Sequence, residues 1–147
     1  WGLTGHIMPT KILVIDDDTA VTDLLSLLLK SQGFEVAATN NSNDGLNFIR
    51  ENQPDLVVLD LMMPEMDGWE VCKSVRAFSK VPIIILSALN DPSMIASVLD
   101  AGADDYLTKP TPSRVLVAHI NRLIKRNETN GSLGHNSMGQ APQMAAS

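Results

Sequence analysis

Short segments rich in Val, Ile and Leu alternate along this chain with longer amphipathic segments. The segments 11–15, 56–59 and 81–86 are almost entirely apolar, which is typical of strands that are covered on both faces of a sheet. Two further segments are less regular but keep the same alternation. We therefore predict five strands, over residues 11–15, 34–39, 56–59, 81–86 and 105–108.

Helical patterns fill the intervals between these strands. In the first interval, apolar residues recur at helical spacing, at Val21, Leu24, Leu25 and Leu28. Asp18 or Thr19 is the expected N-cap of this helix, and Gly33 is its expected end. The remaining helices are predicted after a cap at Ser42 and over residues 68–78, 92–102 and 115–124.

This alternation of strands and helices predicts an α/β fold with a parallel sheet and right-handed crossovers. We expect the flavodoxin-like (βα)5 arrangement, a doubly wound five-stranded parallel sheet with strand order 2-1-3-4-5. In that order the first and third strands are neighbours, and ligands bind beyond the carboxyl ends of the strands.

The two ends of the chain differ in composition from its middle. Residues 1–9 match no predicted element, and we interpret them as a vector-derived remnant or a disordered extension, with a start methionine at Met8. Residues 10–127 form the predicted domain. Residues 128–147 are rich in Asn, Gly, Ser and Gln and are predicted to be a linker or tail.

The composition narrows the classes of function. A chain of 147 residues with 44% hydrophobic residues suits one domain with a substantial core. The net charge of −6 argues against direct nucleic-acid binding by this domain. The single cysteine, Cys72, excludes an internal disulfide and is predicted to be a small apolar core residue. Because no apolar run approaches the roughly 18 residues of a membrane helix, we expect a cytoplasmic protein without membrane contact.

Polar side chains stand at the carboxyl ends of four predicted strands. They are Asp16, Asp17, Asp60, Ser87 and Lys109. If the first and third strands are neighbours, the three carboxylates crowd together, and two such charges about 4 Å apart repel by about 4 kcal/mol at an effective dielectric near 20. A cluster of this kind needs a counter-charge, and a few hard oxygen ligands open to water suit Mg²⁺. Together with a lysine and a hydroxyl, these groups indicate phosphoryl transfer.

Four motifs resemble one family closely. They are IDDD at residues 15–18, LDLMMPEMDG at 59–68, ILSA at 85–88 and GADDYLTKP at 102–110. In this order and spacing they resemble the receiver domain of two-component response regulators (CheY-like), over about residues 10–127. The resemblance implies a signalling switch that assists its own phosphorylation and dephosphorylation but is not otherwise an enzyme.

The resemblance also assigns chemical roles. Asp60 is implied as the phosphoacceptor, which receives its phosphoryl group from a sensor histidine kinase. Asp17 would bind Mg²⁺ directly, Asp16 through water, and Met62 through its backbone carbonyl, with Asp60 completing the ligand set. Lys109 would bind phosphoryl oxygens.

Two further roles concern the response to phosphorylation. Ser87 would also bind a phosphoryl oxygen, and Tyr106 would fill the aromatic switch position and follow Ser87 when it moves. The Lys109-Pro110 bond is cis in the family. An ordinary half-buried aromatic is the alternative interpretation of Tyr106.

The signal output is less sharply defined. The chain looks most like receivers that precede winged-helix DNA-binding domains (the OmpR/PhoB type), although Thr111 stands where those relatives usually carry Phe. Such relatives form homodimers through helix 4, strand 5 and helix 5. Alignment on GADDYLTKP places Ile95 opposite Val115, and Asp105 opposite His119, at the two usual ion-pair positions. The first pair is aliphatic here, and the second joins a carboxylate to a side chain that changes charge near neutral pH.

Three alternatives remain open on the sequence. A stand-alone receiver would act by protein-protein contact without an effector domain, and a receiver-like binding module would not be phosphorylated. A phosphatase of the haloacid dehalogenase type also uses an Asp nucleophile and Mg²⁺. Its Asp-x-Asp-x-Thr/Val signature would end at Ala20, and Asp60 would then have no role.

Overall fold

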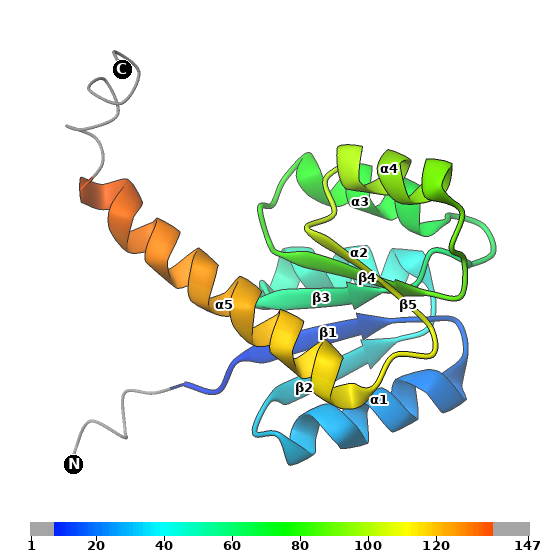
Figure 1. The fold of residues 1–147 in the computed structure, drawn as a ribbon, viewed down its shortest axis with the longest axis horizontal. Coiled ribbons are helices and arrows are strands. Elements are labelled where there is room, and N and C mark those ends of the chain that lie inside the picture. Colours follow the sequence, from blue (N-terminus) through cyan, green and yellow to red (C-terminus); the bar gives the residue numbers. More distant parts are fainter. Residues whose placement is uncertain (1–7, 137–147) are drawn as a thin grey trace.

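The computed structural model describes residues 8–136 (Figure 1). Its centre is one parallel sheet in the order β2-β1-β3-β4-β5. The strands are β1 (Lys11–Ile15), β2 (Glu35–Thr39), β3 (Leu56–Leu59), β4 (Ile83–Ser87) and β5 (Asp105–Thr108). The predicted fold class and strand order are therefore confirmed.

Five helices cover the two faces of this sheet. They are α1 (Thr19–Ser31), α2 (Ser42–Asn52), α3 (Gly68–Arg76), α4 (Pro92–Asp100) and α5 (Ser113–Asn136). One face packs against α2, α3 and α4, and the other face packs against α1 and α5 (Figure 1). No helix in the described part of the chain is long and apolar enough to cross a membrane.

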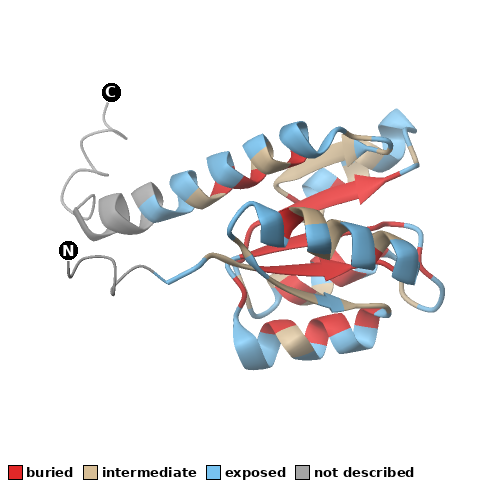
Figure 2. Ribbon diagram, turned by 90° about the horizontal axis from the view of Figure 1, so that it is seen from below, coloured by how far each residue is buried: buried red, intermediate tan, exposed pale blue. Residues whose placement is uncertain are grey.

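The core follows from the alternation of side chains along each strand. In β1, Leu13 and Ile15 face α2 and α3, whereas Ile12 and Val14 face α1 and α5. Both sets are fully buried, which is why the strand reads as an unbroken apolar run. Figure 2 shows strands of the sheet buried, while the helices expose their outer sides. Cys72 is also fully buried in this core, on α3.

The helix starts agree with the predicted caps in one case and differ in another. The side chain of Asp18 accepts a hydrogen bond from the Ala20 N–H and caps α1. At α2 the cap is Asn41, whose side chain accepts from the N–H of Asp44, and not Ser42 as predicted. Both residue types are good caps, so their order in the sequence does not decide which of two neighbours takes the position.

The apolar stripe of α1 is buried less than its regular spacing suggests. Of the predicted stripe, Leu24 is 56% exposed and Val21, Leu25 and Leu28 are half-buried. The leucine that is fully buried against the sheet is Leu29, which lies outside the predicted stripe. An apolar hollow lies between α1 and α5. It is lined by Leu24 and its neighbours on α1, by the start of α5, and by Thr111, which precedes α5.

The last helix is longer than predicted. It continues past Ile124 to Asn136, through residues that the composition assigned to a linker or tail (Figure 1). No proline lies between Pro112 and Pro142, so no residue in this stretch forces the helix to stop. The predictions for residues 1–7 and 137–147 lie outside the described residues.

Candidate functional site

The predicted polar residues meet at the carboxyl edge of the sheet. Strand register explains this, because Ile15 pairs with Leu59 and the next residues in both strands are the acids. The N–H of Asp60 donates to the carbonyl of Ile15 at 3.0 Å, which extends the ladder by one bond and fixes Asp60 beside Asp16. From β4 and the end of β5, the structure adds Ser87 and Lys109 to this edge, and the Lys109 N–H donates to the Ser87 carbonyl at 2.8 Å.

Three carboxylates form the centre of the site. Asp16, Asp17 and Asp60 each place one oxygen within 4.8 Å of the others. Asp16 is 3% exposed and Asp60 7% exposed, whereas Asp17 is open to solvent. The Oδ1 atom of Asp60 is buried without a hydrogen-bond partner among the described residues. An unpartnered carboxylate oxygen beside two more carboxylates fits a hard divalent cation such as Mg²⁺, which prefers oxygen ligands and keeps several waters.

Lys109 neutralises only part of this charge. Its Nζ lies 2.9 Å from Oδ2 of Asp16, with which it forms a salt bridge. The other oxygen of Asp16 accepts the Asp18 N–H at 2.9 Å, so both oxygens of Asp16 are engaged. The sequence indicated that Lys109 belongs to the site but not which acid it would contact, because that depends on the conformation of a long side chain.

The electrostatics of Asp60 reflect its position among other acids. Burial raises the pKa of its carboxyl group above the ordinary value. Lys109 acts in the opposite direction, Asp16 raises the pKa further, and the Met62 backbone N–H and the Ser87 hydroxyl lower it. The side chain of Met62 itself is 53% exposed, so its apolar character does not disturb the carboxylate cluster.

Ser87 and Tyr106 are linked through the loop that follows β4. Ser87 is fully buried, and its Oγ accepts the Leu89 N–H at 3.3 Å. The Tyr106 hydroxyl donates to the carbonyl of the same Leu89 at 2.5 Å. Burial raises the pKa of the Tyr106 hydroxyl, and the nearby Ser87 hydroxyl lowers it. Leu89 is thus a shared contact of both residues, and no sequence pattern singled it out.

The peptide bond between Lys109 and Pro110 is cis. It lies between the end of β5 and the start of α5, where the chain must reverse direction after delivering Lys109 to the site. The bond therefore stands next to the only cation that contacts the carboxylate cluster within the described residues.

The predicted interface residues lie on α4, β5 and α5. His119 Nδ1 contacts the Asp105 carboxylate within the same chain at 2.5 Å, and Arg122 contacts the same oxygen at 2.7 Å. Val115 is 39% exposed and Ile95 is half-buried. The structure thus joins Asp105 and His119 inside one chain, a contact that the alignment placed at an interface.

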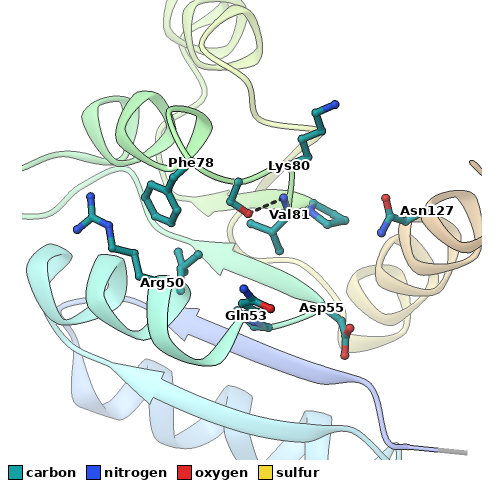
Figure 3. Close-up of a pocket in the computed structure, with 11 residues that line it drawn as sticks. Arg50, Gln53, Asp55, Phe78, Lys80, Val81 and Asn127 are labelled. Atoms are coloured by element: carbon teal, nitrogen blue, oxygen red, sulfur yellow. Dashed lines mark hydrogen bonds between the residues drawn. The ribbon is translucent and has the colours of Figure 1, made fainter. Parts of the chain in front are cut away.

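A separate hollow lies at the opposite edge of the sheet, near the amino ends of β3 and β4 (Figure 3). Its volume is about 320 Å³. The Arg50 guanidinium lies 4.5 Å from the centre of the Phe78 ring, whereas Lys80 points away from the hollow in Figure 3. None of Asp16, Asp17 and Asp60 lines this hollow, so it is separate from the site predicted from the acids.

Comparison with known proteins identifies the family of this chain. Residues 12–121 match the family model described as the response regulator receiver domain. The chain belongs to this family. It is a family of signalling domains and not a catalytic enzyme family, so the receiver prediction is confirmed over the phosphatase alternative.

Curated relatives of this receiver domain include regulators of transcription. This chain is 46% identical to the transcriptional regulatory protein AfsQ1 of Streptomyces coelicolor over 121 residues. The aligned region covers 82% of this chain and 53% of that protein. It is 42% identical, with the same coverage, to the DNA-binding response regulator MtrA of Mycolicibacterium smegmatis. The chain therefore spans about half the length of these relatives.

Solved structures share the fold. A CheY-like receiver domain from Methanospirillum hungatei has a TM-score of 0.80 at 27% identity and covers 84% of this chain and 99% of that chain. The BeF3-activated N-terminal receiver domain of Klebsiella pneumoniae RstA has a TM-score of 0.75 at 32% identity. This match covers 78% of this chain and 97% of that chain. Receiver domains bind Mg²⁺ at an acidic pocket and interact with histidine kinases, and the aspartate cluster provides such a pocket here.

Proposed function

We propose that this receiver accepts a phosphoryl group on Asp60 from a sensor histidine kinase. The observation that carries the proposal is the Asp60 carboxylate, which ends the central strand, is 7% exposed and keeps one buried oxygen without a hydrogen-bond partner among the described residues. A structural carboxylate would have its oxygens paired, whereas a nucleophile needs a free one.

The proposed step exchanges one phosphorus bond for another. An Asp60 carboxylate oxygen attacks the phosphorus, the bond between phosphorus and the kinase histidine nitrogen breaks, and an acyl phosphate forms on Asp60. Bound Mg²⁺ would supply charge neutralisation for the phosphoryl oxygens. In this chain Asp17 would hold the ion directly, Asp16 through water and Met62 through its backbone carbonyl.

Lys109 and Ser87 would bind the remaining phosphoryl oxygens. Lys109 now pairs with Asp16, so we propose that it turns from that carboxylate toward the phosphoryl group, which carries up to two negative charges. Ser87 is fully buried beside the site and would move toward the same group.

Movement of Ser87 would alter its neighbours on the face formed by α4, β5 and α5. Because Ser87 and Tyr106 share Leu89 as a contact, displacement of one changes the surroundings of the other. We propose that Tyr106 changes position with phosphorylation. This is a two-state shift, whose extent depends on how much better one state accommodates the phosphoryl group.

For the output, we propose that the receiver controls a transcriptional regulator in the cytoplasm. The support is the description of the relatives as a transcriptional regulatory protein and a DNA-binding response regulator. The net charge of −6 assigns the DNA contact to another part of such a protein. A stand-alone receiver remains the second candidate, and both share the same phosphorylation chemistry.

Incubation with acetyl phosphate and Mg²⁺, followed by intact mass measurement, tests the phosphoacceptor. The parent should gain one phosphoryl group, and Asp60→Asn should gain none because the amide is not a nucleophile. Asp55→Asn is the matched control, because it makes the same substitution at the opposite end of β3. This variant should be phosphorylated like the parent. Equal phosphorylation of Asp60→Asn would contradict the proposal.

A further inference from the structure

The loop between β3 and α3, residues 60–67, is closed tightly at its two ends. The N–H groups of Met63 and Gly68 both donate to the Leu61 carbonyl, each at 3.1 Å. A Cβ atom on Gly68 would stand 2.8 Å from the Asp60 carbonyl oxygen, so the start of α3 presses directly against the end of the strand. This loop carries Met62, and its shape therefore affects the surroundings of Asp60.

The middle of the loop is held in a strained turn. The Met66 N–H donates to the Pro64 carbonyl at 2.8 Å, and the intervening Glu65 has a φ of 72°. A hydrogen bond between residues i and i+2 around a positive φ is the rarer, strained form of the γ-turn. Glutamate carries a Cβ that disfavours this conformation, so contacts outside the turn must help to keep it.

Ser42 provides such a contact from a different element. Its hydroxyl donates to the Met66 carbonyl at 2.6 Å, and the residue is 4% exposed. Ser42 is free to make this bond because Asn41 caps α2 in its place. The first residue of α2 thus holds the residue that closes the strained turn, across a separation of 24 positions in the sequence.

We propose that Ser42 is a positioning residue of the phosphoacceptor site, which keeps the β3–α3 loop in its strained conformation and thereby sets the affinity of the site for Mg²⁺. The metal part of this inference rests on the proposed role of the Met62 carbonyl. Without the Ser42 hydroxyl, the Met66 carbonyl loses a buried donor and the turn relaxes. The fraction of molecules with a binding-competent loop then falls, and the apparent affinity falls with it.

Ser42→Ala in the full chain tests the inference by two measurements. In metal-free protein, amide hydrogen exchange of Met66 should accelerate about fivefold, the factor equivalent to about 1 kcal/mol for one lost hydrogen bond. In an NMR titration with MgCl₂, the dissociation constant should rise by up to about fivefold. A purely structural role would lower the melting temperature but leave the Mg²⁺ dissociation constant at the parent value.

Two further variants make the result specific. Ser31→Ala is the matched control, because the Ser31 hydroxyl also donates to a backbone carbonyl at 2.6 Å but lies at the end of α1. It should leave both measurements unchanged. Glu65→Gly in the Ser42→Ala background should restore Mg²⁺ affinity, since glycine adopts a positive φ without the Cβ penalty. Failure of this rescue, together with slow Met66 exchange in Ser42→Ala, would overturn the inference.

The two measurements also separate this inference from the proposed function. If the parent shows no Mg²⁺-dependent shifts at Asp16, Asp17 and Asp60, the metal part of the proposed function is wrong, and Met66 exchange still decides whether Ser42 holds the loop. If the parent binds Mg²⁺ and Ser42→Ala binds it equally well, the proposed function stands and the positioning role is wrong.

Discussion

Two groups of aspartates in this domain look alike in the sequence but differ in the fold. Asp16 and Asp17 follow β1, next to Asp60, whereas Asp104 directly precedes β5 and Asp105 is its first residue. The second group is fully paired. Asp104 contacts Arg76 at 3.0 Å and Arg126 at 2.9 Å, and Asp105 contacts His119 and Arg122. The first group has three carboxylates and one contacting cation, Lys109.

The two groups differ in how far their carboxylates are paired with cations. Asp104 also accepts the Ile83 N–H at 2.8 Å, so its carboxylate ties β5, β4 and α3 together. Asp60, by contrast, keeps its buried Oδ1 atom without a hydrogen-bond partner among the described residues. Adding a cation to the unpaired group, or removing one from the paired group, tests this contrast.

Added Mg²⁺ should stabilise the domain through the unpaired group. A ligand at 100 times its dissociation constant adds about 2.7 kcal/mol to the free energy of unfolding when only the folded state binds it. The melting temperature of the parent should rise with MgCl₂, and that of Asp17→Ala should rise much less. An equal rise in both proteins would remove Asp17 from the set of principal ligands.

Removal of Arg76 should destabilise the domain through the paired group. Its guanidinium donates two hydrogen bonds to the Gly102 carbonyl, one to the Ser79 carbonyl and one to Asp104, and all four are lost in Arg76→Met. We expect a loss of about 2 kcal/mol in urea unfolding. Phosphorylation of the folded variant by acetyl phosphate should match the parent, and a lost phosphorylation would mean that the two groups are coupled.

The pH dependence of metal-free protein should reveal the raised pKa of Asp60. Between the unfolded value of 3.8 and the higher folded pKa, the folded state holds a proton that the unfolded state has released. The free energy of unfolding therefore falls as pH rises through this interval and stays lowered above it. Asp60→Asn should lack this fall and be more stable than the parent at neutral pH. At pH 3 the difference should disappear, and a difference that persists there would have another cause.

The smallest expected effect concerns self-association through α4, β5 and α5. Because Asp105 is already paired with His119 and Arg122 of its own chain, moderate salt should have little influence on a dimer made by this face. Lower pH should strengthen such a dimer only slightly, because the Asp105–His119 pair already forms within one chain and not between two. Ile95→Asp should weaken it, because a carboxylate replaces an apolar contact. Sedimentation of BeF3-treated protein across salt concentrations and pH measures all three, and a salt-sensitive dimer unaffected by Ile95→Asp would contradict the apolar interface.

The fold and the carboxylate cluster were predictable because both depend on strand order and on strand ends. An apolar run that stops at Asp60 places this residue at the edge of the sheet for any conformation of its side chain. The contacts of Lys109 were not predictable, since several acids lie within reach of its flexible side chain. The contact of Ser42 with Met66 was not predictable either, because Asn41 and Ser42 are both good helix caps. Only the folded structure shows that Asn41 takes the cap and leaves the Ser42 hydroxyl to donate to the loop.

The extent of α5 was missed for a similar reason. Composition marks residues 128–147 as polar, with few apolar side chains to pack, but polarity does not prevent a helix that is already nucleated from continuing. The start of α5 is held by Leu116, Ile120 and Leu123 against the sheet, and the helix propagates from there to Asn136.

The buried thiol of Cys72 has a consequence for the signals this domain answers. Burial in the core raises the pKa of the thiol to about 12, so at neutral pH it stays protonated, whereas oxidants and electrophiles react with the thiolate. Cys72 is the single cysteine of this chain and is fully enclosed. Oxidants therefore meet no reactive thiol in this chain, and cysteine oxidation would not interfere with a phosphoryl signal in this domain.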